Sequence, residues 1–80
     1  MLESLEQAII QFRLGMEAGA NHSLVTFIDG FLAAFKAGKF SAEVQNVQPL
    51  LEEILGAQER GDYLWAADLL EYEIAPIVRR

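Results

Sequence analysis

The sequence predicts an all-α protein, a four-helix up-down-up-down bundle in one domain. Three glycine-containing turn signals divide the 80 residues into four stretches of helical length, at 18–21, 37–41 and 60–62. Apolar residues within these stretches recur at steps of three and four, and strict two-residue alternation is absent. Short turns make sequential helices antiparallel neighbours, so we expect a bundle.

The first helix is expected over residues 2–18. Its apolar residues fall within one narrow arc, which predicts the following core stripe: Leu2, Leu5, Ile9, Phe12 and Met16. Ile10 and Leu14 lie off this stripe, among polar residues. Two interpretations of this pair remain open, namely chance exposure, which is common, and contact with a partner.

The second helix is expected over residues 22–36, with Asn21 or Ser23 as its N-cap. It is the most apolar of the four, and its apolar side chains cover about half of the circumference. That width is typical of a helix central to a core or to an oligomer. The remaining surface is a narrow strip made of His22, Thr26, Asp29, Ala33 and Lys36.

The third helix is expected over residues 42–59, after Ser41 as N-cap. Its apolar face continues through Pro49 without a change of phase, and includes Val44, Val47, Leu51, Ile54 and Leu55. We therefore predict one helix, kinked at Pro49, with the proline on the outer side. The alternative is a short helix that ends at Val47 and a new one with Pro49 in its first turn.

The fourth helix is expected over residues 62–78 and has two apolar faces. The first, which we assign to the core, contains Tyr63, Ala66, Ala67, Leu70, Ile74 and Ile77. The second contains Trp65, Leu69, Tyr72 and Pro76. A second face needs a second packing partner, and aromatic residues often anchor interfaces. We predict that these four residues, with Ile10 and Leu14, form a homodimer interface.

Composition excludes several classes of function. The chain is 52% hydrophobic with mean hydropathy +0.19, carries a formal net charge of −6, and contains no cysteine. The negative charge argues against binding to nucleic acid or to anionic membrane surfaces. Apolar runs are too short to span a bilayer, and the N-terminus lacks the pattern of a secretory signal. We therefore expect a cytoplasmic protein without membrane insertion.

The candidate residues for chemistry are isolated from one another in the sequence. His22 is the sole histidine, and we interpret it as a surface or capping residue. Asp29 is best read as facing water; an acid–base role with a raised pKa and a polar contact between subunits are the alternatives. The sequence contains no phosphate-binding loop, nucleophile elbow or metal-ligand spacing. We expect no enzymatic activity, no catalytic residue, no metal and no cofactor.

Acidic residues dominate the C-terminal half of the chain. Between Glu43 and Glu73 there are eight acids and one base, Arg60. We favour a solvated face that keeps an apolar protein soluble over electrostatic steering of a basic partner.

The C-terminal helix resembles a known signature. The segments Gly61–Tyr63 and Ala66–Ile74, followed by Pro76, are similar to the C-terminus of small uncharacterised helical proteins of Gram-positive bacteria. The resemblance covers about 20 of 80 residues and implies a helical protein with no assigned catalytic residue. The layout is also similar to flagellar export chaperones, which are small acidic bundles that hold a secreted subunit.

The function that we expect is that of a non-enzymatic helical protein–protein interaction module or adaptor that associates with itself. The alternative is an export-type chaperone that holds an amphipathic segment of a secreted or flagellar client. A metal-dependent bundle enzyme is a third class. A chaperone should leave an apolar groove open, whereas a stable homodimer should leave little apolar surface free.

Overall fold

The computed structural model describes residues 1–39 and 44–79, and the regular structure in these ranges is helical. The elements are α1 (Leu2–Arg13), α2 (Glu17–Lys36), α3 (Val44–Glu59), α4 (Tyr63–Leu69), the π-helix η1 (Leu70–Ile74) and α5 (Ala75–Val78). No strand occurs in the described ranges, so the all-α prediction is confirmed. The predicted N-cap Ser41 and helix start at Ala42 lie outside the described residues, as does the Val44 side chain.

A glycine in the left-handed region ends each of the three helices α1, α2 and α3. The φ angles are +70° at Gly15, +76° at Gly38 and +74° at Gly61. After α1, the Met16 amide donates to the Gln11 carbonyl oxygen at 2.9 Å, as in a Schellman motif. Equivalent bonds follow α2 and α3. The turns predicted around Gly38 and Gly61 therefore end α2 and α3 as expected.

The first predicted turn is wrong by four residues. The chain turns at Gly15, and Gly19 lies inside α2. A Cβ atom at Gly19 would lie 3.0 Å from Gln11 Nε2, so this glycine serves the close approach of α1 and α2 and not a turn. The predicted N-caps Asn21 and Ser23 are consequently interior residues of α2.

The hydrophobic core draws on every long helix. Leu5, Ile9 and Phe12 of the predicted first stripe are buried, but the two ends of that stripe, Leu2 and Met16, are exposed. Leu2 lies in the first turn of α1. Met16 lies in the turn between α1 and α2, although the sequence predicts it inside the first helix. The largest fully buried side chains are Phe12, Phe27, Phe31, Leu5, Leu24, Ile54, Leu70 and Ile74.

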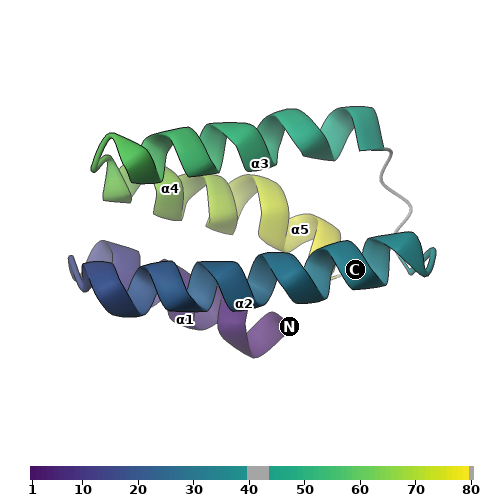
Figure 1. Ribbon diagram of the computed structural model, residues 1–80, viewed down its shortest axis with the longest axis horizontal. Helices are drawn as coiled ribbons and strands as arrows, with labels where there is room; N and C mark the ends of the chain where they lie inside the picture. The colour runs from purple at the N-terminus through teal and green to yellow at the C-terminus, as the bar shows by residue number, and fades with distance from the viewer. Residues whose placement is uncertain (40–43, 80) are drawn as a thin grey trace.

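Two helical hairpins make up the described chain. Close backbone contacts join α1 to α2 and α3 to α4, and the two hairpins meet where α1 packs against α4. In Figure 1, α3 lies along the top and α2 along the bottom, with α4 and α5 seen between them. α2 and α3 approach each other less closely: their side chains meet in the hydrogen bond between Asn21 and Gln58, and further along the helices an open apolar groove lies between them.

Pro49 lies within one helix. α3 extends without interruption from Val44 to Glu59, and Pro49 is exposed, as predicted for a proline on the polar side. The alternative of two separate helices is therefore wrong. An exposed position lets the missing N–H and the bulky ring face away from the core.

A π-helical turn interrupts the C-terminal helix. The Ala75 amide donates to the Leu70 carbonyl oxygen five residues earlier, which widens the turn. Pro76 explains this geometry, because its ring would clash with the Tyr72 carbonyl in an α-helix and it has no N–H to donate. Leu70, Ile74 and Ala75 are all buried, so the wider turn faces the core.

Candidate functional site

The six residues predicted to form an interface do not lie on one face. Ile10, Leu14, Trp65 and Tyr72 are exposed, with between 43% and 68% of their surface accessible. Pro76 is also exposed. Leu69 lies in the core, at 6% exposure, because its side of α4 is covered within the chain.

The exposed members of this set lie on two sides of α4. Trp65 lies toward α3, where its Nε1 donates to Glu53 Oε1 at 3.1 Å. Ile10 and Leu14 belong to α1, on the other neighbour of α4. Between these regions, Arg13 Nη2 forms ion pairs with Asp68 at 3.2 Å and Glu71 at 3.3 Å.

The π-turn also separates Trp65 from the end of the predicted face. The sequence predicts Trp65, Tyr72 and Pro76 on one face, on the assumption of α-helical spacing. The wider turn at residues 70–74 adds one residue, which rotates later side chains by about 100° relative to that spacing. Pro76, which follows this turn, therefore does not continue the Trp65 face in α-helical phase, and Tyr72 lies within the turn.

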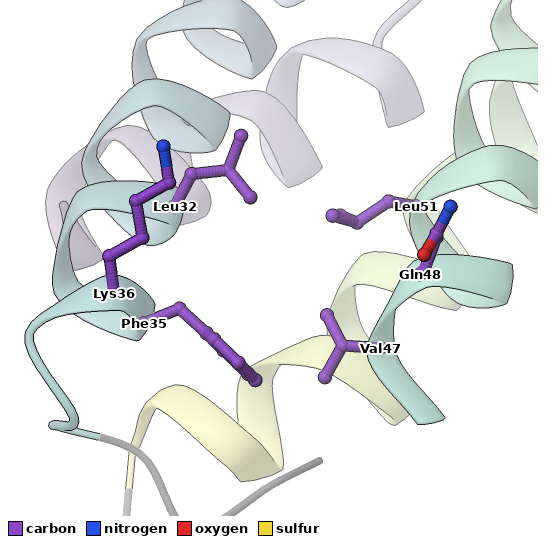
Figure 2. Close-up of a pocket in the computed structure, with 6 residues that line it drawn as sticks. All are labelled: Leu32, Phe35, Lys36, Val47, Gln48 and Leu51. Carbon is purple, nitrogen blue, oxygen red and sulfur yellow. The ribbon is translucent and has the colours of Figure 1, made fainter. Parts of the chain in front are cut away.

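An apolar groove lies between α2 and α3. Its cavity measures about 250 Å³ and is lined by Leu32, Phe35, Lys36, Val47, Gln48 and Leu51. Figure 2 shows that Leu32 of α2 and Leu51 of α3 point toward each other across the open centre, while Phe35 and Val47 lie at one end. Only the polar ends of Lys36 and Gln48 interrupt an otherwise hydrocarbon lining.

The apolar faces that form this groove continue beyond the cavity. On α2, helical spacing places Val25 and Ile28 on the same side as Leu32. On α3, Leu55 follows Leu51 by one turn. Leu32 and Leu55 are 42% and 43% exposed, and Val25 is 58% exposed. The groove thus combines a partly covered floor with apolar edges that water reaches.

A hydrogen bond joins α2 and α3 beyond the cavity. Gln58 Nε2 near the end of α3 donates to Asn21 Oδ1 near the start of α2, at 2.7 Å. The interval from Asn21 to Lys36 along α2 corresponds to about 22 Å of helix. The bond therefore lies about four helical turns from Lys36, at the far end of the apolar faces that continue from the cavity.

The polar strip predicted on α2 is confirmed as solvent-facing. His22, Thr26, Asp29 and Lys36 are all exposed. Within the described ranges, no group of three histidine or acidic side chains is arranged to hold a metal ion.

Three side chains at the contacts of α1 and α2 with α4 and η1 have raised pKa values. Desolvation lowers the pKa of Arg13, but hydrogen bonds and charges from Asp68 and Glu71 raise it more, so the net shift is upward. Hydrogen bonding to Glu17 raises the pKa of Tyr63, and hydrogen bonding to Glu71 raises that of Tyr72. These shifts strengthen the existing charge states, which is typical of structural contacts.

The groove was not predicted as a site. The sequence predicts Leu32, Phe35 and Leu51 as members of the apolar faces of their helices. The spacing of apolar residues does not show which of these faces other parts of the chain cover. The available signal was the width of the apolar surface of α2, about half of its circumference. α1 and the core cover only part of that width, and the rest lines the groove.

Comparison with known proteins gives a family but no activity. Among the described residues, no helix is long and apolar enough to cross a bilayer. No curated protein and no solved structure matches the chain. The model of a domain of unknown function, DUF8042, matches residues 1–80. The match covers the whole sequence and extends well beyond the C-terminal signature, so the chain belongs to the DUF8042 family.

Proposed function

We propose that this protein is a non-enzymatic protein–protein interaction module, an adaptor that binds an amphipathic helix of a partner between α2 and α3. The open apolar groove is the observation that carries this proposal. We further propose that the helices form an up-down-up-down bundle, kinked at Pro49, which acts in the cytoplasm.

The geometry of the groove suits a helix. Two roughly facing helices present apolar side chains at helical spacing, with Leu32 and Leu51 on opposite walls. A third helix would place residues at i, i+3, i+4 and i+7 between these walls. Each leucine that becomes fully buried adds up to about 1.5–3 kcal/mol, so a few contacts supply useful affinity.

Exposed groove residues allow a test that leaves the fold intact. We expect Leu32→Ser to weaken binding of a labelled amphipathic helical peptide at least about fivefold, because a leucine contact is replaced by a polar group. Fluorescence anisotropy measures the affinity, and far-UV circular dichroism checks the fold.

Leu64→Ser is the matched control, because Leu64 is 61% exposed and belongs to α4, outside the groove. Equal weakening by Leu32→Ser and Leu64→Ser, or no effect of Leu32→Ser, would contradict the proposal.

Self-association through the Trp65 face is a separate part of the proposal. Trp65 remains 43% exposed although its Nε1 is bound to Glu53, so its ring can still contact a second copy. We expect Trp65→Ala to weaken the homodimer while the helical signal stays largely unchanged. Light scattering over a range of concentrations measures this, and a wild-type monomer at every concentration would reject the dimer.

An export-type chaperone for a secreted or flagellar client is the second candidate. The open groove favours it, because such a chaperone presents an apolar surface before its client arrives. A chaperone should bind the client segment and keep it from aggregating, whereas an adaptor should bind a partner that is already folded. Light-scattering assays of client aggregation with and without the protein distinguish the two.

A further inference from the structure

The charges beside the groove are mainly acidic. α3 contains three acids, Glu52, Glu53 and Glu59, and no base. Glu53 contacts Arg60 and Trp65, on the side of α3 toward α4. Glu52 and Glu59 form no ion pair in the described chain, and their spacing of two helical turns places them on the same side of α3.

Glu52 lies at the edge of the groove, and Glu59 follows on the same side of α3, beside the apolar face that continues from it. Glu52 Oε1 accepts a hydrogen bond from Gln48 Nε2 at 3.4 Å, and Gln48 lines the cavity. Glu59 follows Glu52 by seven residues, or about 10.5 Å along the helix. It is exposed next to Gln58, which bridges to Asn21.

The opposite edge carries one acid and one base. Asp29 is exposed on α2, one turn from both Val25 and Leu32, and has no ion-pair partner among the described residues. Lys36 lies two turns further, at the open end of the groove. Three acids without ion pairs therefore border the groove, against the single base Lys36.

We propose that the occupant of the groove is a basic amphipathic helix, with an apolar stripe against α2 and α3 and lysine or arginine on both flanks. This inference rests on the function proposed above and adds the charge of the partner. Flanking bases seven residues apart would match the interval between Glu52 and Glu59, and a further base on the other flank would match Asp29.

A second copy of this chain fits the groove less well. Its net charge is −6, and its own exposed apolar helix faces carry the same acidic edges. Docking one such face onto another brings like charges together, which disfavours association. A basic helix instead gains long-range attraction before contact, which raises the association rate at low salt.

Three labelled peptides of about 18 residues test this inference with the full-length protein. All can form the same helix: one has an apolar stripe flanked by lysines, one has the same stripe flanked by glutamates, and one has lysines with the stripe changed to serine. We expect the first to bind roughly tenfold more tightly than the second at low salt, and this ratio to shrink as salt is added. The third should not bind measurably.

Charge reversal on the protein locates the effect. Glu52→Lys combined with Glu59→Lys should abolish or reverse the preference between the lysine and glutamate peptides. Glu3→Lys combined with Glu73→Lys makes the same change in net charge at exposed residues away from the groove, and should preserve most of the preference. An equal loss with both pairs would assign the preference to net charge and overturn the inference.

Failure of the inference and failure of the proposed function give different results. Equal binding of the lysine and glutamate peptides, lost in Leu32→Ser, would overturn the basic partner and leave the helix-binding groove in place. Absence of binding by either peptide, or binding unaffected by Leu32→Ser, would overturn both. A wild-type dimer that Leu32→Ser dissociates, without peptide binding, would make a second copy the occupant.

Discussion

The contact between α1 and α4 and the groove between α2 and α3 both combine apolar side chains with charged groups. The apolar side chains touch in the first region and stay apart in the second. At the first, the Phe12 and Tyr63 rings stack with centroids 5.8 Å apart, and Arg13 bridges to Asp68 and Glu71. At the second, Leu32 and Leu51 face each other across an open cavity.

This difference identifies the apolar surface that a partner would stabilise by covering it. In the contact between α1 and α4, the Phe12 and Tyr63 rings pack against each other, and Phe12 is 1% exposed. The groove keeps apolar surface in contact with water, which is unfavourable unless another molecule covers it. A partner that covers the groove therefore gains free energy of burial that the already buried Phe12 ring does not offer.

The largest expected effect separates the two regions by stability. Phe12→Ala should lower the free energy of unfolding by about 3–5 kcal/mol, because Phe12 is 1% exposed and its loss leaves a cavity. Leu32→Ser should lower it by less than about 1 kcal/mol, because Leu32 is already 42% exposed. Urea unfolding followed by circular dichroism measures both, and similar losses would show that the groove is closed in solution.

An intermediate effect is expected at the hydrogen bond that joins α2 and α3 beyond the cavity. Gln58→Ala should cost about 1 kcal/mol, because it removes the donor to part-buried Asn21. Gln48→Ala is the matched control on the same helix, since its bond to Glu52 is exposed and 3.4 Å long. If the control lowers stability as much as Gln58→Ala does, the Asn21–Gln58 bond does not hold α2 and α3 together.

The smallest effect is expected at the edge of the groove. Asp29→Asn should change the free energy of unfolding by no more than about 0.5 kcal/mol, because Asp29 is exposed and has no ion-pair partner in the described ranges. The same variant should weaken binding of the lysine-flanked peptide. A loss of stability above about 2 kcal/mol would mean that the carboxylate is buried or bonded, and that it does not face a partner.

Much of the fold could be predicted from the sequence, because helix spacing and C-terminal glycines are local signals. The ends of α2 and α3 at Gly38 and Gly61 follow this rule. The first turn was misplaced because both Gly15 and Gly19 look like helix ends in the sequence. Only the packing of Gly19 against Gln11, a contact between two helices, distinguishes them.

The candidate site was harder to predict, because it depends on which faces remain uncovered. The exposure of Trp65 and Tyr72 matches the reading of the second face, but Leu69 is buried. The π-turn caused by Pro76 rotates the side chains that follow it relative to those before it. A prediction that assumes α-helical spacing throughout does not detect this rotation. The groove itself arises from the relative placement of two hairpins, which no local pattern encodes.

The closest backbone contacts between the two hairpins lie where α1 meets α4, and this placement has a mechanical consequence. If α1 and α2 move as one rigid body and α3 and α4 as another, a rotation about the contact between α1 and α4 widens or narrows the groove without unwinding a helix. The Asn21–Gln58 hydrogen bond, which joins α2 to α3, then opposes this rotation. Occupancy of the groove and packing at Phe12 and Tyr63 become thermodynamically coupled, so a substitution in that packing alters affinity at a surface it does not touch.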